Sequence, residues 1–388
     1  MPDDFLRRFG RFLEQGRTQE PQTGRPAPDG AATGADEQAP PDRRAPDGAA
    51  TGADEEAALP GQRVDTPFGH VQVLATRVHL PLLLPPRVTG AAGRLKDRRL
   101  AGFDRQQALF FDVEATGLSH GAGTVAFLLG LGRFDGDDLV VEQVLLADYD
   151  EECAQLQLLL ERLSQTTYLV SYNGKSYDTS VLANRLVVNR FMDREEAQLK
   201  LRPHLDLLHL GRRLYSGLLP DHTLATLERE VLRRPRLDDL PGELVPQHYF
   251  QYLLTRDPSY LAPVLAHNLQ DVVSLALLAH EMLLLLADGS QERRVRLCFN
   301  IGKTLADGGF FAEALPHLRI GMTRDEPDLA LPAARLLARA LRKLSARPEE
   351  LLAVWEELLA IAGERMDPAE RDEVQRRVER LRKALRQS

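Results

Sequence analysis

The stretch that decides the fold is Ala108-Leu-Phe-Phe-Asp-Val-Glu-Ala-Thr-Gly-Leu118. Its apolar start is typical of a strand buried on both faces of a sheet, which disfavours a strand end with two solvated acids. Because side chains alternate along a strand, Asp112 and Glu114 point to the same face. Two neighbouring carboxylates on a buried strand repel each other, and burying them without a partner is costly. The stretch therefore predicts a central strand whose acids hold a divalent cation such as Mg²⁺ or Mn²⁺.

Further strands and helices are predicted on both sides of this stretch. Apolar or alternating runs predict strands at 71–78, 125–134, 139–146, 168–172 and 204–208, the last of which runs into a helix through residue 215. Helical spacing of apolar residues predicts helices at 151–163, 176–190 and 261–286. Strands that come first as a group and then alternate with helices indicate an α/β sheet with helices on its faces.

Two more acids fall where such a sheet would gather them. Asp178 follows the strand at 168–172 and opens a helix, where a solvated acid favoured by the helix dipole is the alternative. His267 and Asp271 are four residues apart in the long helix and share a face. An acid and an imidazole among Leu, Val and Ala are costly unless they face a site, although a surface pair is equally compatible with the sequence.

Composition excludes several classes of protein. The chain has 388 residues, 43% of them hydrophobic, which is enough for two domains. With 49 basic and 57 acidic residues the formal net charge is −8, so any contact with nucleic acid requires a local basic patch. The 6 lysines stand against 43 arginines spread along the chain, which we attribute to GC-rich codons. Two distant cysteines, Cys153 and Cys298, exclude a disulfide scaffold and a zinc site of paired cysteines.

The sequence gives no sign of a membrane or a secretory route. Uninterrupted apolar runs such as 282–287 are too short to cross a bilayer. The first residues lack a basic region followed by an apolar stretch. The expectation is a soluble, cytoplasmic protein without membrane contact.

Three regions are predicted along the chain. Residues 1–60 form a disordered low-complexity tail, in which the segment 27–37 recurs unchanged at 45–55. Residues 61–288 form the sheet domain, and residues 289–388 form a helical domain. If the two domains have separate cores, deleting about 290–388 should leave the sheet domain folded.

The helical domain has one unit with the spacing of a tetratricopeptide repeat. Looser helix pairs follow at 331–344 and 349–362, with a capping helix at 370–385, and a plain helical bundle is the alternative. The residues at the repeat positions are Cys298, Ile301, Gly302, Leu305, Phe311, Ala314 and Leu318, with Pro327 near the end.

At these motifs the chain resembles a known family. Asp112-x-Glu114 with Thr-Gly-Leu behind it looks like the first motif of the DEDD superfamily of 3′–5′ exonucleases, named for its four acids. The spacing from Asn173 to Asp178 is similar to the second motif, particularly in family B polymerase proofreading domains, and Asp271 resembles the third. The chain is most similar to the YprB-like predicted exonucleases, over about residues 65–285. That likeness extends through Leu205-Asp-Leu-Leu208, Arg212-Arg213, Leu227-Glu-Arg-Glu230, Asp239-Leu-Pro-Gly242, Tyr249-Phe250 and His267-Asn268.

The resemblance implies a fold and an activity. The expected fold is a ribonuclease H-like mixed sheet flanked by helices, followed by the tetratricopeptide-like helical domain. The expected activity is 3′–5′ hydrolysis of phosphodiester bonds at single-stranded DNA or RNA ends, with two Mg²⁺ or Mn²⁺ ions. The residues that would hold the ions are Asp112, Glu114, Asp178 and Asp271.

The resemblance also implies the neighbours of the ions. Thr116, Gly117 and Leu118 would contact the terminal nucleotide, and Asn173 would orient the site. His267 lies four residues before Asp271, which is the spacing of the superfamily's tyrosine branch, whereas the histidine branch has its histidine five residues before. The sequence therefore leaves open whether His267 is the general base or takes no part.

Other interpretations concern single residues and the whole protein. Asp206 is expected to be a helix N-cap rather than a fifth ligand. A catalytically weak or inactive nucleic-acid-binding or scaffold protein on the same fold, with its helical domain bound to a protein partner, is the alternative function, and the presence of all four acids favours the enzyme. Five arginines fit a groove for a nucleic-acid strand as well as solvated helix faces, namely Arg212, Arg213, Arg233, Arg234 and Arg236.

Overall fold

The computed structural model describes residues 59–80, 90–117, 121, 123–194, 197–237, 239–289, 292 and 294–387. The tail predicted at 1–60 lies outside the described residues up to position 58, and so does Leu118.

One sheet of seven strands is present in the described part of the chain, in the order β1-β2-β5-β4-β3-β6-β7. In this spatial order, each adjacent pair from β1 across to β3 is antiparallel, whereas β3 pairs with β6 and β6 with β7 in parallel. β3 lies inside the sheet, as its apolar start predicts, and the carboxyl ends of the three parallel strands meet at one edge. The strands are β1 (Gln62–Thr66), β2 (Gly69–His79), β3 (Ala108–Ala115), β4 (Ala126–Asp135), β5 (Asp138–Leu145), β6 (Tyr168–Ser171) and β7 (His204–Asp206).

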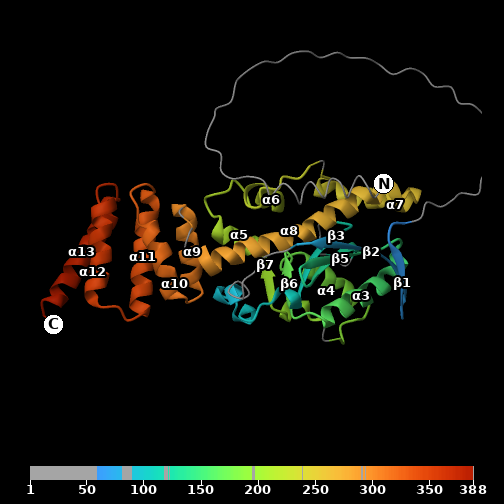
Figure 1. Cartoon of the computed structure of the whole chain (residues 1–388), viewed down its shortest axis with the longest axis horizontal. Helices are drawn as coiled ribbons and strands as arrows, with labels where there is room; N and C mark the ends of the chain where they lie inside the picture. The colour runs from blue at the N-terminus through green and yellow to red at the C-terminus, as the bar shows by residue number, and fades with distance from the viewer. Residues whose placement is uncertain are drawn as a thin grey trace, which may run out of the picture.

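Helices cover both faces of this sheet (Figure 1). Leu109 and Phe111 pack in a cluster with α3 and α4, whereas Phe110 packs in a cluster with α8. Since side chains alternate along β3, Asp112 and Glu114 face α8. The helices of this region are α3 (Glu152–Ser164), α4 (Asp178–Val188), α5 (Leu207–Leu214), α6 (Leu224–Glu230), α7 (Val245–Thr255) and α8 (Leu261–Asp288).

The predicted fold class, a mixed α/β sheet followed by helices, is confirmed. Each predicted strand and helix is present, with ends that differ by a few residues. β1 was not predicted, because its sequence Gln-Arg-Val-Asp-Thr is almost entirely polar and the strand lies at the edge of the sheet.

α8 lies unusually close to the sheet because glycine stands beneath it. A Cβ at Gly132 of β4 would lie 2.6 Å from Val272 Cγ1 of α8. α8 is also long and apolar enough to cross a membrane by length and composition, so the expectation that no segment could do so was wrong. That expectation considered only uninterrupted apolar runs, whereas a few polar residues are compatible with a span. Most of the helix is buried inside the protein, as expected of a core helix.

The C-terminal helices pack one after another in a row beyond the end of α8 (Figure 1). A Cβ at Gly302 would lie 2.8 Å from Leu318 Cγ, so the first two helices of the row approach closely where the repeat pattern places a small residue. The helical character of this region is confirmed, and its tetratricopeptide character stays a prediction. The helices are α9 (Val295–Asp307), α10 (Phe311–Gly321), α11 (Pro327–Lys343), α12 (Pro348–Ala362) and α13 (Pro368–Leu385).

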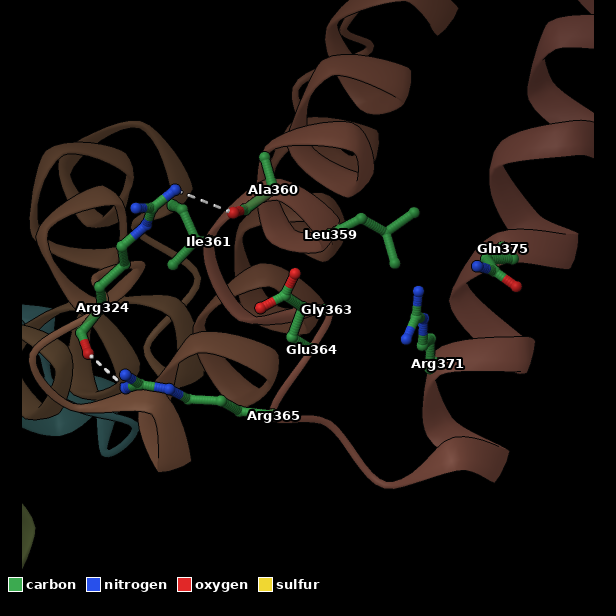
Figure 2. Close-up of a pocket in the computed structure, with 9 residues that line it drawn as sticks. All are labelled: Arg324, Leu359, Ala360, Ile361, Gly363, Glu364, Arg365, Arg371 and Gln375. Carbon is green, nitrogen blue, oxygen red and sulfur yellow. Dashed lines mark hydrogen bonds between the residues drawn. The ribbon is translucent and has the colours of Figure 1, made fainter.

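A hollow of about 530 Å³ lies between α12, α13 and the loop that joins α10 to α11 (Figure 2). Arg324 donates a hydrogen bond to the carbonyl of Ala360 at 3.2 Å, and Arg365 donates one to the carbonyl of Arg324 at 3.4 Å. Both arginines therefore satisfy backbone carbonyl acceptors of the helical row. None of the residues that line the hollow is among the candidate catalytic residues.

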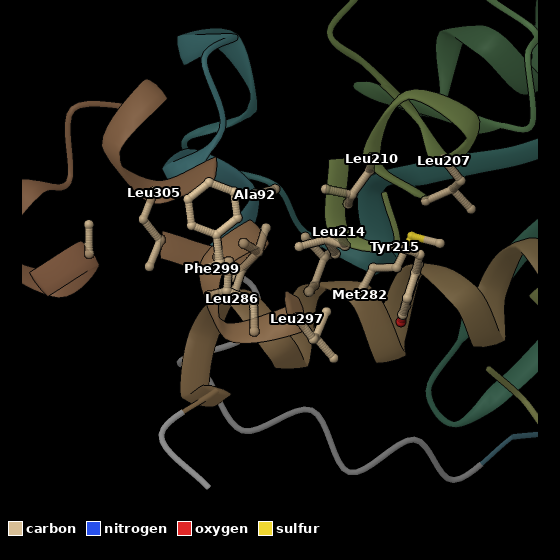
Figure 3. Close-up of a cluster of buried hydrophobic side chains, with 14 of the residues drawn as sticks. Ala92, Leu207, Leu210, Leu214, Tyr215, Met282, Leu286, Leu297, Phe299 and Leu305 are labelled. Carbon is tan, nitrogen blue, oxygen red and sulfur yellow. The ribbon is translucent and has the colours of Figure 1, made fainter. Parts of the chain in front are cut away.

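The sheet region and the helical row share one apolar cluster (Figure 3). Leu297 and Phe299 of α9 pack in the same cluster as Leu214 of α5 and Leu286 of α8. The side chain of Asn300 adds hydrogen bonds to the carbonyls of Leu214 and Ser216, at 2.9 and 3.0 Å. The condition of separate cores is therefore not met, and the boundary at residue 288 stays a prediction.

Deleting residues 290–388 is expected to make the remaining chain aggregate, contrary to the result expected for separate cores. Each large apolar side chain costs about 1.5–3 kcal/mol to expose. Uncovering about five of them would cost about 7–15 kcal/mol, which is comparable with the whole net stability of a typical domain, about 5–15 kcal/mol. Size-exclusion chromatography of the truncated and full chains tests this, and a soluble truncated monomer with an unchanged melting temperature would contradict it.

Candidate active site

Asp112 and Glu114 project from β3 toward α8, near the edge where the parallel strands end. The amide of Asn268 on α8 donates a hydrogen bond to Asp112 Oδ2 at 2.9 Å. Asn268 is fully buried and in turn accepts a hydrogen bond from Gln143 Nε2 at 3.0 Å. This chain of hydrogen bonds, from Gln143 through Asn268, fixes the position of Asp112 Oδ2.

α8 also brings an acid and an imidazole to the same place. His267 Nε2 lies 3.8 Å from Glu114 Oε1 and 3.6 Å from Asp271 Oδ2. One ligand atom from each of these three residues lies within 4.8 Å of the other two. The pair on α8 is therefore not a surface pair, since it faces the acids of β3.

Asp178 reaches the site from the first turn of α4. It is buried, and its carboxylate interacts electrostatically with Asp112 and Glu114. A Cβ at Gly174 would clash with Ser171 Oγ and lie 2.8 Å from Asp178 Oδ2. Glycine at 174 therefore lets the loop between β6 and α4 fold back closely enough to place this acid.

Burial and mutual repulsion raise the pKa values of Asp112, Glu114 and Asp178. Burial, followed by the charge of Asp271, raises the pKa of Asp112 to about 7. Burial and the charge of Asp112 raise the pKa of both Glu114 and Asp178 well above their usual values. For His267, burial alone would lower the pKa, but Asp271, Asp239 and Glu114 outweigh it and raise the pKa to about 10. The site thus has an excess of negative charge that a cation would relieve.

Arg236 supplies part of the missing positive charge, which the sequence did not predict. Its side chain is only 9% exposed, so neither a strand-binding groove nor a solvated helix face describes it, and both interpretations were wrong for this residue. The guanidinium forms ion pairs with Asp271 Oδ1, with Asp239 at 2.8 Å and with the fully buried Glu228. The loop after α6 is therefore tied to α8 directly beside the acids.

Two of the residues expected to contact substrate, Thr116 and Gly117, form hydrogen bonds that fix the backbone beside the acids. Thr116 Oγ1 accepts a hydrogen bond from the Val125 amide at 3.0 Å, so its hydroxyl holds the end of β3 to β4. The carbonyl of Gly117 accepts a hydrogen bond from the Tyr177 hydroxyl at 2.5 Å, which links the first acidic segment to the loop before Asp178.

Asp206 explains the shape of that loop. Its side chain accepts hydrogen bonds from the backbone amides of Leu208, Asn173 and Lys175, at 3.1, 3.0 and 3.1 Å. The N-cap interpretation is therefore confirmed. Asn173 is exposed and adopts a left-handed backbone with φ of 63°. The bonds from Asp206 hold that conformation, which Asn tolerates better than most residues.

Replacing Gly130 with Ala is expected to push α8 away from the sheet. The new Cβ would clash with Asn268 Oδ1 and lie 2.7 Å from Val272 Cγ2. Overpacking of this kind costs about 1–3 kcal/mol, which denaturant unfolding would measure. Because Asn268 holds Asp112, activity should fall in the folded variant as well. Gly123→Ala is the control, because its new Cβ would meet no atom within 4 Å in the described part of the chain. Its unfolding midpoint should stay unchanged. An unchanged unfolding midpoint for Gly130→Ala would contradict the expectation.

The donor set fits a hard or borderline divalent cation. Four carboxylates and one imidazole converge from β3, α4 and α8, and oxygen-rich sets of this kind suit Mg²⁺ and Mn²⁺. Asp112, Glu114, Asp178 and Asp271 could hold such ions, and burial together with mutual repulsion raises the pKa values of the first three.

Comparison with known proteins assigns this region to a class. Residues 109–283 match the family model of the RNase_H superfamily, so the chain carries a ribonuclease H-like domain. Ribonuclease H-like nucleases use divalent metals.

A curated relative extends the likeness. The chain is similar to "Uncharacterized protein YprB" of Bacillus subtilis (strain 168), with 34% identity over 258 residues. The match covers 66% of this chain and 61% of the relative, so the chain spans less than two thirds of the relative's length.

Proposed function

We propose that this protein is a metal-dependent exonuclease that hydrolyses phosphodiester bonds at single-stranded DNA or RNA ends in the 3′ to 5′ direction. The observation that carries the proposal is the convergence of Asp112, Glu114, Asp178 and Asp271 at one edge of a ribonuclease H-like sheet. The direction of attack and the single-stranded substrate rest on the resemblance of the acidic motifs to the DEDD superfamily.

Two Mg²⁺ or Mn²⁺ ions bound by these acids would supply a water of lowered pKa and neutralise the charge that develops on the phosphate. The protein's part is to hold the carboxylates in place, through Asn268 behind Asp112 and Arg236 beside Asp271. The ends of β3 and of the β6–α4 loop, with Thr116, Gly117, Leu118 and Asn173, would hold the terminal nucleotide against the acids.

A second candidate function is a nucleic-acid-binding or scaffold protein with little or no activity, whose helical row binds a protein partner. The observation that favours it is the ion pair of Arg236 with Asp271, because a resident guanidinium already neutralises one acid of the set. Such a protein would bind an oligonucleotide without shortening it.

End-labelled oligonucleotides distinguish the two candidates. The enzyme should shorten a 5′-labelled single strand stepwise in Mn²⁺ and release the label of a 3′-labelled strand at once. EDTA should stop both reactions. Binding without shortening, in Mg²⁺ and in Mn²⁺ and with both DNA and RNA, would overturn the exonuclease and support the scaffold.

A further inference from the structure

His267 is held in one orientation by a carboxylate on the outer side of the site. Its Nδ1 lies 2.9 Å from Asp239 Oδ1, and the side chain is only 10% exposed. Arg236 Nη1 donates a hydrogen bond to the other oxygen of Asp239 at 2.8 Å. With Nδ1–H given to Asp239, an ion that displaces the proton of Nε2 would bind the lone pair that this nitrogen then presents to the acids.

The distances around Nε2 are those of ligands that share an ion. Nε2 lies 3.8 Å from Glu114 Oε1 and 3.6 Å from Asp271 Oδ2, which is too long for hydrogen bonds. Ligand atoms about 2.0–2.2 Å from a common ion lie roughly 3–4 Å from one another. Arg236 binds Asp271 Oδ1 and leaves free the oxygen that faces His267.

Histidines that bind metal almost always donate their other ring N–H to a carboxylate or carbonyl, which fixes the ring and its tautomer. Asp239 is placed to do this for His267. The sequence predicted the four acids as ligands and left the histidine as a base or a bystander. A carboxylate at Nδ1 orients a general base as well, so the ligand role depends on the distances from Nε2 to Glu114 and Asp271.

We propose that His267 binds a divalent ion through Nε2, together with Glu114 and Asp271, and that Asp239 is its positioning residue. This rests on the proposed function only in that the ion is the one the acids would hold. A nitrogen ligand in an oxygen-rich set favours borderline ions, so the site should prefer Mn²⁺ over Mg²⁺. His267 would then not serve as the general base.

Pulsed electron paramagnetic resonance tests the assignment on the full chain, without any activity. Mn²⁺ is added below one equivalent, and the electron spin echo modulation is recorded. We expect modulation from a directly bound ¹⁴N, which changes to that of ¹⁵N when the protein is made with ¹⁵N-histidine. His267→Gln should abolish it, whereas His209→Gln, at an exposed histidine 4.0 Å from another carboxylate, should leave it intact.

Affinity supplies the second readout. Asp239→Asn is expected to weaken Mn²⁺ binding by about 10- to 100-fold, measured by calorimetry, with less effect on Mg²⁺. Mn²⁺ bound without nitrogen modulation in the unaltered protein would overturn the assignment and leave the exonuclease proposal standing. Failure of Mn²⁺ to bind the full chain would overturn both. The labelling experiment uses the unaltered protein, so the assignment stays testable even if a variant fails to fold.

Discussion

Asp112→Asn is expected to reduce nuclease activity by about 10³-fold or more, because losing several kcal/mol of charge stabilisation by metal changes a rate by that amount. Asp112 is one of the four acids that would hold the ions, and it lies on a strand inside the sheet. Asparagine keeps an oxygen that can accept the hydrogen bond from Asn268, so the fold should survive. The loss would therefore report the missing charge rather than unfolding.

Initial rates on a labelled oligonucleotide in saturating Mn²⁺ measure this effect. The matched control is Asp138→Asn, at a half-buried aspartate of β5 that pairs with Arg77 and His79 of β2, and its rate should be unchanged. Equal rates for Asp112→Asn and the unaltered protein, in preparations free of other nucleases, would exclude the proposed site.

The second large effect is on stability without metal, which should fall as the pH rises from about 5 to 8. The pKa of Asp112 in the folded protein is about 7, against an ordinary value of 3.8. Between these values the folded state binds more protons than the unfolded state, so the free energy of unfolding decreases with rising pH. The raised pKa values of Glu114 and Asp178 act in the same direction. His267, with a pKa raised to about 10, extends the loss to higher pH.

Melting curves in EDTA at pH 5 and pH 8 test this expectation. Since about 1 kcal/mol shifts the melting temperature by roughly 2–4 °C in a domain of 150–250 residues, a fall of at least about 5 °C is expected. Mn²⁺ should restore more stability at pH 8 than at pH 5, because it binds the ionised acids of the folded state. Asp112→Asn should flatten the dependence on pH. A higher melting temperature at pH 8 than at pH 5 in EDTA would contradict the electrostatic description of the site.

Much of the fold could be predicted from the sequence, because local patterns report burial directly. The apolar run before Asp112 identified an internal strand, and the helical spacing of apolar residues over 261–286 identified the long helix α8. The same patterns placed Asp112 and Glu114 on one face of a strand. They placed Asp178 at the start of a helix and Asp271 on one face of the long helix, and an α/β sheet with helices on its faces brings these elements together. The polar edge strand β1 has no such pattern and was missed.

The partners of the acids could not be predicted, because they depend on contacts between distant segments. Asn268 follows His267 in the sequence, but only the close packing of α8 on Gly130 shows that it reaches Asp112. Arg236 is one of many arginines and stands in a loop without periodicity, so nothing local marks it as buried. In the sequence, the segment Asp239-Leu-Pro-Gly242 entered only as part of the family likeness. Its carboxylate has a role only in the structure, where Asp239 Oδ1 lies 2.9 Å from His267 Nδ1.

α8 has 28 residues and is therefore about 42 Å long at 1.5 Å per residue. One part of this rod carries Asp271 and His267, and its far end is clamped among the helices of the C-terminal row. One continuous helix therefore carries two of the candidate ligands and also anchors the C-terminal row, so the position of these ligands depends on the packing of both regions.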